Sequence, residues 1–220
     1  MSVPTIFEWL ERFAFLQSMS GVFLLVGLAV LLFFVPDWRV GLLALLGQYL
    51  LLGLLFAEVL APRLAAVKVL VGLFVCLVLY VSARQAAWGR DSGAGGLSGP
   101  RRLRVGTAEV VVSAPLRLFV AAVWVVLAFS LGANGVQLPG AAGAAPHLLL
   151  AVVTLGGLGL LILALSGDLL RAGMGVLLAL AAFDLFYSGV EPALAMLIGL
   201  GVLSLLVAVA LGYVVQAARV

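Results

Sequence analysis

Charged residues are unusually rare in this 220-residue chain. Charged residues make up 10% of it and apolar residues 65%, and its mean hydropathy is +1.33. A soluble domain has roughly 25% charged and about 45–50% apolar residues. The composition therefore excludes an ordinary water-soluble fold and predicts an all-α, polytopic helical membrane protein. Its function must then lie in the few polar groups left among the apolar runs.

Cysteine and histidine each occur once. Cys76 alone forms neither an internal disulfide nor a zinc site, and His147 alone excludes a self-contained histidine metal centre or a bis-histidine haem. We therefore expect no cofactor. The sequence also has no Walker loop, G-x-S-x-G, H-E-x-x-H or C-x-x-C motif, so an enzyme acting alone is not expected. The net charge of +3 comes from one basic loop, which gives no support for nucleic-acid binding.

About seven apolar runs approach the roughly 20 residues that cross a bilayer as a helix. Helices are expected because lipid offers no hydrogen-bond partner to backbone N–H and C=O groups. The predicted spans are Met19–Pro36, Val40–Ala57, Leu64–Ser82, Leu116–Gly132, His147–Ser166, Leu169–Tyr187 and Ala193–Val215.

The first 18 residues predict a short amphipathic helix on the membrane surface. Ile6, Trp9, Leu10 and Phe13 recur at helical spacing with charged residues on the other side, as in interfacial helices. A plain extension of the first span is the alternative. We expect no cleavable signal peptide, because a basic leader is missing.

Basic residues cluster between the third and fourth predicted spans, and the positive-inside bias then places the N-terminus outside and the C-terminus in the cytoplasm. The chain divides into the surface helix (1–18), a three-span front section (19–84), a basic cytoplasmic loop (85–115) and a four-span rear section (116–220). Segment 104–113 has enough β-branched residues for a short strand. The arginine-rich, Ala/Gly/Val/Leu-rich composition suggests the plasma (inner) membrane of a prokaryote.

Ionisable residues inside a span are costly and point to function. Lys68 is one, and Glu58 across a short turn is its expected ion-pair partner; snorkelling of Lys68 to the interface is the alternative to a proton path. Asp184 is the second candidate, with Glu191 seven residues further on. At about 1.5 Å of rise per residue, Asp184 falls near the outer interface, so a hydrated, structural carboxylate is the favoured interpretation.

Neutral polar and small residues complete the candidates. Gln48 and Tyr49, in the middle of the second span, are expected to form hydrogen bonds across helices. Clustered glycines of the rear section predict close helix packing. These glycines are Gly156, Gly159, Gly173, Gly175, Gly199 and Gly201.

The rear section resembles the small K-type (chain 4L) membrane subunit of complex I. Segment 147–186, HLLLAVVTLGGLGLLILALSGDLLRAGMGVLLALAAFDLF, is similar to that family's first two spans: an apolar helix, a tight polar turn and a second helix. The whole chain resembles hydrogenase-4 component E, which joins extra N-terminal spans to such a unit. In that comparison Gln48 and the triplet Lys68-Val69-Leu70 match a Gln and a Lys-Val-Leu of the family.

One departure from the family bears on function. The K-type subunit carries a membrane-embedded glutamate on its second and on its third span, used in proton transfer. The position that matches the first glutamate is Leu177, and the second falls near Leu206. Asp184 lies two helical turns from Leu177 on the same face, so the carboxylate is displaced at best. We therefore do not expect a continuous proton relay through this chain alone.

The resemblance implies a non-catalytic integral subunit of a complex I-like or membrane-hydrogenase-like proton- or ion-translocating complex. Its partners would be membrane lipids and the antiporter-like and electron-transfer subunits, and it would complete a half-channel at most. One alternative is a small stand-alone seven-helix transporter built from two triple-helix repeats, although the two halves show no convincing sequence similarity. The other is a membrane assembly or interaction protein.

Overall fold

The computed structural model describes residues 15, 18–35, 37–86, 101–105, 108–112, 114–133, 145–191 and 193–217. Within these residues it contains seven helices, and each coincides with one predicted span to within a few residues. The all-α class is confirmed. The helices are α2 (Met19–Phe34), α3 (Trp38–Val59), α4 (Pro62–Gln85), α5 (Ala114–Ala133), α6 (Pro146–Leu165), α7 (Leu169–Val190) and α8 (Leu194–Ala217).

Helix starts follow local chemistry. Helices α4 and α6 begin with Pro62 and Pro146, because proline lacks an N–H that the first turn would leave unpaired. Helix α3 begins after Asp37, whose carboxylate accepts a hydrogen bond from the Arg39 backbone N–H at 3.0 Å. That bond satisfies one of the unpaired donors of the first turn.

A short hairpin precedes α5. Strands β1 (Arg101–Val105) and β2 (Ala108–Val112) pair antiparallel, with Arg101 opposite Val112. Strand β2 confirms the strand expected within 104–113, whereas β1 was not predicted. The amphipathic helix predicted over 1–18 lies outside the described residues, apart from Phe15 and Ser18.

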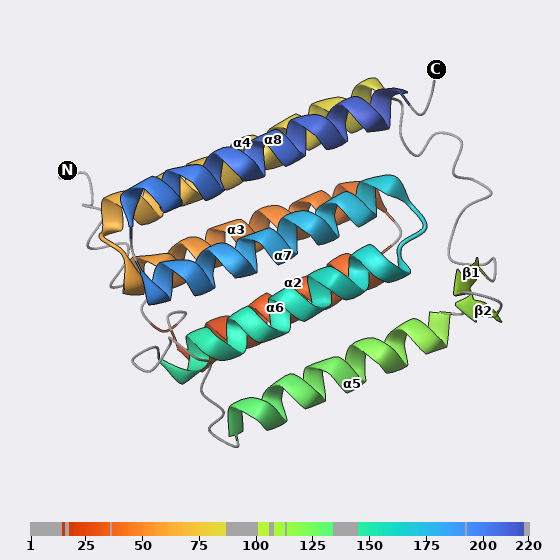
Figure 1. Cartoon of the computed structure of the whole chain (residues 1–220), viewed down its shortest axis with the longest axis horizontal. Coiled ribbons are helices and arrows are strands. Elements are labelled where there is room, and N and C mark those ends of the chain that lie inside the picture. Colours follow the sequence, from red (N-terminus) through yellow and green to blue (C-terminus); the bar gives the residue numbers. More distant parts are fainter. Residues whose placement is uncertain are drawn as a thin grey trace, which may run out of the picture.

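The helices form two stacked layers (Figure 1). Helices α2, α3 and α4 lie side by side in one layer, and α5, α6, α7 and α8 in the other. Across the layers α2 packs on α6, α3 on α7 and α4 on α8. Helix α5 sits at the edge against α6, where the indole of Trp124 lies on Gly157 in a space that a Cβ atom would occupy.

The two triplets α2–α3–α4 and α6–α7–α8 run in the same directions. Helices α4 and α8 show this along their lengths: Lys68 meets Leu197, Ser82 faces Gly212, and Gln85 accepts a hydrogen bond from Gln216 at 2.8 Å. Each pair joins positions about 130 residues apart. The structure therefore contains a parallel three-helix repeat, and α5 is the connecting helix.

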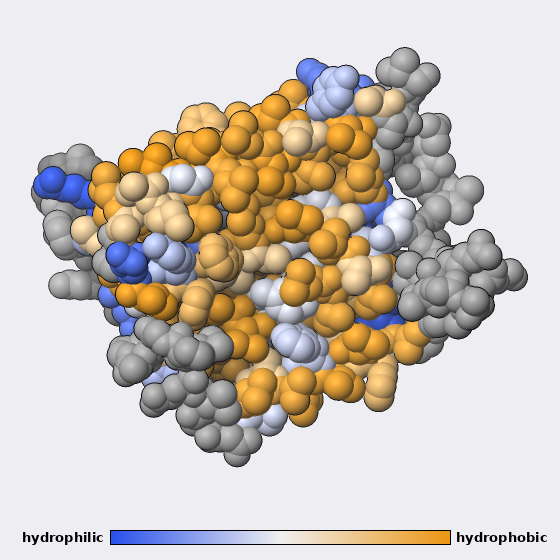
Figure 2. Space-filling view, in the orientation of Figure 1, coloured by the Kyte–Doolittle hydropathy of each residue, from blue (hydrophilic) through white to orange (hydrophobic). Residues whose placement is uncertain are grey.

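The outside of the bundle is apolar. Large hydrophobic side chains such as Leu43 (67% exposed), Val126 (68%) and Leu206 (60%) point outward, and Figure 2 shows hydrophilic residues gathered toward the two ends of the helices. Five helices, α3, α4, α6, α7 and α8, are long and apolar enough to cross a membrane. Helix α2 and the Leu116–Gly132 part of α5 are shorter apolar helices.

Candidate functional site

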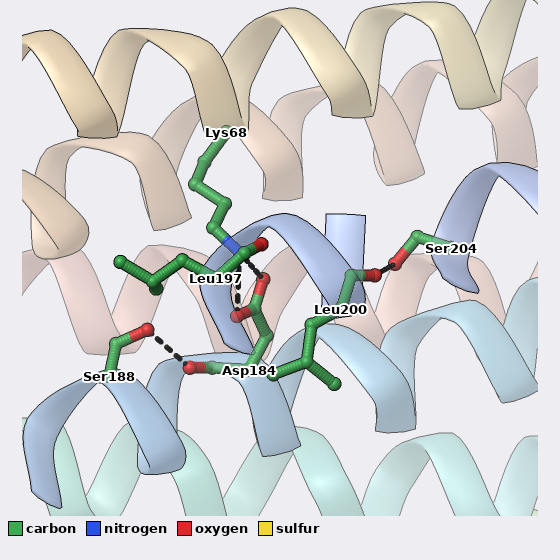
Figure 3. Close-up of polar contacts among 6 residues, drawn as sticks. All are labelled: Lys68, Asp184, Ser188, Leu197, Leu200 and Ser204. Atoms are coloured by element: carbon green, nitrogen blue, oxygen red, sulfur yellow. Dashed lines mark hydrogen bonds and ion pairs between the residues drawn. The ribbon is translucent and has the colours of Figure 1, made fainter. Parts of the chain in front are cut away.

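The candidate site is an ion pair between the two helix layers. Lys68 lies on α4 and Asp184 on α7, and they are 8% and 6% exposed. The Lys68 ammonium donates to both carboxylate oxygens of Asp184, at 2.8 and 2.7 Å. Figure 3 shows the lysine stem reaching from its own layer to the carboxylate on the facing layer. The pair therefore joins the two repeats.

All three ammonium protons of Lys68 have acceptors. Besides the two carboxylate oxygens, the backbone carbonyl of Leu197, in the first turn of α8, accepts the third at 2.8 Å. The ammonium also lies 5.8 Å from the centre of the Phe56 ring, within the range of a cation–π contact. A lysine has three donors, so the charge is fully hydrogen-bonded although it is removed from water.

The pair lies inside the helices rather than at their tips. Lys68 is six positions from the start of α4, and Asp184 six positions before the end of α7. At 1.5 Å of rise per residue, both lie about 9 Å from the helix end. A charge at that depth with no partner would be costly, which is why the two charges neutralise each other.

Two expectations about charged residues are wrong. Glu58 does not pair with Lys68: its carboxylate lies 2.8 Å from Nε2 of His147, because the end of α3 meets the start of α6. Asp184 is not a hydrated interfacial carboxylate, since the α4–α7–α8 junction encloses it. Glu191, just after α7, is exposed and is not part of the site.

The neighbours of Asp184 on α7 and α8 are bonded within their own helices. Ser188 donates to the backbone carbonyl of Asp184 at 2.7 Å, and Ser204 donates to that of Leu200 at 2.9 Å, as Figure 3 shows. Both hydroxyls therefore donate to backbone carbonyls and not to the Asp184 carboxylate. The carboxylate oxygens of Asp184 thus depend on Lys68.

The expectation that Gln48 and Tyr49 bond across helices is also wrong for the part of the chain that the structure describes. Both amide atoms of Gln48 and the Tyr49 hydroxyl are buried with no hydrogen-bond partner there. The Tyr49 ring nevertheless reaches α4, because it lies against Gly72, where a Cβ atom would overlap it.

The predicted packing glycines behave differently from one another. A Cβ atom at Gly159 would lie 2.7 Å from the Ala179 nitrogen and 2.8 Å from the Gly175 oxygen, and one at Gly173 would lie 2.7 Å from Leu211. Glycine at 159, 173 and 175 therefore permits close packing of α6, α7 and α8. Gly156 and Gly201 have only ordinary contacts at 3.7 Å, and Gly199 has nothing within 4 Å, so no close approach explains these three.

The ion pair between Lys68 and Asp184 was not predicted, although the sequence contained an indication of it. They are the only Lys and the only Asp within the predicted spans, and opposite charges in a membrane interior attract each other. The Glu58–His147 pair carried no such signal, because it depends on how the two layers stack. Among the described residues no group of three or more His, Cys, Asp or Glu is placed to hold a metal ion.

Comparisons of the chain with protein-family models, with curated proteins and with solved structures give no match. The fold and the site define the class: a multi-pass helical membrane protein with a buried ion pair between two layers of helices.

Proposed function

We propose that the chain is a non-catalytic integral membrane subunit of a complex I-like or membrane-hydrogenase-like assembly that moves protons or other ions. The observation that carries this proposal is the Lys68–Asp184 pair, held at 2.7 Å inside an apolar bundle. Buried acid–base pairs of this kind mark proton and ion pathways in membrane proteins. The resemblance to hydrogenase-4 component E and to the K-type subunit points in the same direction.

The proposal includes seven membrane crossings, with the N-terminus outside and the C-terminus in the cytoplasm of a prokaryotic cell. Support comes from charge at the helix ends. Arg39 at the start of α3, Arg84 near the end of α4 and Arg171 near the start of α7 lie at one end of the bundle. Clusters of basic residues favour the cytoplasmic side. Arg171 also donates to the Val35 carbonyl, which joins the ends of α2 and α7.

The chain would contribute part of a path rather than the whole. Asp184 exchanges a proton most readily when Lys68 moves away or a neighbouring group supplies one. Leu177, at the position of the family's first glutamate, is fully buried, and Leu206, at the second, is 60% exposed on the outside of the bundle. Antiporter-like neighbours would therefore provide the remaining carboxylates, and electron-transfer neighbours the redox chemistry.

Purification of the native protein in mild detergent tests the proposal. Stoichiometric co-migration on a native gel with antiporter-like and cluster-bearing subunits, identified by mass spectrometry, is the expected result. Migration as a lone monomer or homo-oligomer would contradict it. Asp184→Asn and Lys68→Ala should then abolish ion translocation by the purified complex while leaving its electron transfer to artificial acceptors intact, with Glu191→Gln as the matched control.

One observation favours a second function, a stand-alone transporter. The segments α2–α3–α4 and α6–α7–α8 run in the same directions and stack on each other, and secondary transporters with internal repeats bind substrate and ions at the interface between the repeats. The Lys68–Asp184 pair occupies that interface. Ion or solute flux catalysed by the pure protein in liposomes, and lost in Asp184→Asn, would select the transporter over the subunit.

A further inference from the structure

The hairpin that precedes α5 has two unlike faces. In its register Arg102 lies opposite Val111 and Arg104 opposite Glu109. Paired residues of an antiparallel ladder share a face of the sheet, and successive residues of a strand alternate between the faces. The arginine face therefore carries Arg102, Arg104, Glu109 and Val111. The apolar face carries Leu103, Val105, Ala108, Val110 and Val112, with Arg101 at its end.

The apolar face of the hairpin has no helix packed along it in the part of the chain that the structure describes. Strands β1 and β2 have each other as their main neighbours there. A two-stranded hairpin by itself is marginally stable at best in water, and it gains stability when an apolar layer covers one of its faces. Such a layer must come from outside the described chain.

The position of the hairpin indicates what that layer is. Strand β2 ends at Val112, and α5 begins two residues later at Ala114. Exposed apolar residues of α5, such as Leu118 and Phe119, follow within its first turns. Figure 1 shows the hairpin beside the start of α5, at the end of the bundle where α4 and α8 also end. Because α4 and α8 are long and apolar enough to cross a membrane, their ends mark the depth at which hydrocarbon gives way to lipid headgroups.

The charge of the hairpin matches anionic headgroups. Its strands, RRLRV and AEVVV, contain three arginines and one glutamate. Arg39 and Arg84, at the same end of the bundle, are exposed as well. Segments with arginine on one face and apolar residues on the other bind in the membrane interface, and anionic lipids attract them. A lipid layer supplies both partners, hydrocarbon for the apolar face and phosphate for the arginine face, at adjacent depths.

We propose that the β1–β2 hairpin lies on the membrane surface and binds the headgroups of anionic phospholipids. Its apolar face rests on the hydrocarbon boundary, and its arginine face lies among the phosphates. The bound hairpin fixes the start of α5 at the membrane surface. This inference goes beyond the proposed function, because it concerns the lipid that the chain selects and holds whether or not the Lys68–Asp184 pair moves ions.

Fluorescence quenching of the full-length protein in lipid nanodiscs tests the proposal. In a Cys76→Ala background, Val110→Cys places a fluorophore on the apolar face and Val111→Cys places one on the arginine face. In phosphatidylcholine mixed with phosphatidylglycerol, a brominated lipid should quench position 110 more than 111, and water-soluble acrylamide should quench 111 more than 110. In phosphatidylcholine alone, acrylamide should quench both positions alike, because the hairpin leaves the surface. Added inorganic phosphate should not restore the difference, which separates a lipid headgroup from a free anion.

Removal of the arginines should have the same effect as removal of the anionic lipid. Arg102→Gln combined with Arg104→Gln should lower the ratio of bound to free hairpin by about 30-fold, since each arginine near an anionic surface contributes about fivefold. Arg63→Gln is the matched control, because Arg63 is also exposed but lies at the start of α4, at the opposite end of the bundle. This variant should leave the ratio unchanged.

Three results would overturn the lipid site. One is equal quenching of positions 110 and 111 by acrylamide in the anionic nanodisc, which would leave the hairpin in water. Another is protection of both positions from acrylamide and from the brominated lipid, which would mean that protein covers the hairpin. The third is a quenching difference that persists in phosphatidylcholine alone or in the double arginine variant. Ion transport is not measured in any of these experiments, so the proposed function and the lipid site fail separately.

Discussion

Lys68 and Asp184 are 116 positions apart in the chain and meet at 2.7 Å between α4 and α7. Their contact is a property of the repeat, because α4 belongs to the first triplet of helices and α7 to the second. The pair therefore has a structural role, holding the layers together, in addition to any role in ion movement.

Breaking the pair from one side should destabilise the protein strongly. Lys68→Met leaves a buried carboxylate with no cation, and Asp184→Leu leaves a buried ammonium with no anion. Each single change should cost about 3–5 kcal/mol, whereas the double variant should recover most of that loss, because two apolar side chains fill the site without charge. Reversible unfolding of the four proteins in one detergent gives the double-mutant cycle.

Glu58→Gln provides the comparison for that cycle. The Glu58–His147 pair lies near the helix ends, with side-chain exposures of 32% and 17%, and such partly solvated pairs contribute about 0–1 kcal/mol. If Glu58→Gln lowered the free energy of unfolding as much as Asp184→Leu does, burial would not be the reason that the Lys68–Asp184 pair is costly to break.

Close helix contact at Gly159 should not tolerate a methyl group. A Cβ atom there meets backbone atoms of α7 at 2.7 and 2.8 Å, and backbone cannot move aside as a flexible side chain does. Gly159→Ala should therefore lower the free energy of unfolding by about 1–3 kcal/mol. The measurement is the denaturation midpoint in detergent.

Gly199→Ala is the matched control, because nothing lies within 4 Å of the new methyl group. Alanine is about 1 kcal/mol better than glycine inside a helix, so this variant should be neutral or stabilised. Equal destabilisation by the two alanines would mean that α6 and α7 do not approach each other as the structure has them.

Much of the fold was predictable from the sequence, because a bilayer allows few backbone structures. Apolar runs of about 20 residues gave the number and approximate bounds of the helices. The stacking of the layers was not predictable. Apolar helices of similar composition carry little sequence signal for a repeat, which explains why the two halves show no convincing similarity although their helices run in parallel.

Of the four residues predicted for a proton path, Lys68 and Asp184 form the site, whereas Glu58 and Glu191 lie outside it. Lys68 and Asp184 stood out because charge is rare inside the spans. Glu58 was expected to pair with Lys68 because it is near in sequence, but Glu58 precedes the turn into α4 and Lys68 points across the layers instead. Which partner lies across a layer depends on the register of α4 against α7, and no local pattern encodes that register.

Cysteines at the ends of α4 and α8 should be cross-linked by a short bifunctional maleimide if the two helices are parallel. Gln85 and Gln216 share a hydrogen bond of 2.8 Å between their side-chain amides. Gln85→Cys with Gln216→Cys, in a Cys76→Ala background, should be joined by a short bis-maleimide and then migrate faster on a denaturing gel. Gln85→Cys with Gly199→Cys should not, because Gly199 lies near the opposite end of α8; cross-linking of that pair would contradict the parallel register.

Labelling of single cysteines should show that α5 crosses the membrane. The α2–α3 and α6–α7 connections lie at one end of the bundle and the α3–α4 and α7–α8 connections at the other (Figure 1). All variants carry Cys76→Ala. Ala61→Cys and Glu191→Cys should react with an impermeant maleimide on intact cells. Asp37→Cys and Gly167→Cys should react only after permeabilisation, because the proposed orientation places the arginine-rich end of the bundle in the cytoplasm. If the cysteines at positions 37 and 167 were labelled from opposite sides of the membrane, both ends of α5 would have to lie on the same side. The second triplet would then be inverted relative to the first, and Lys68 would not reach Asp184.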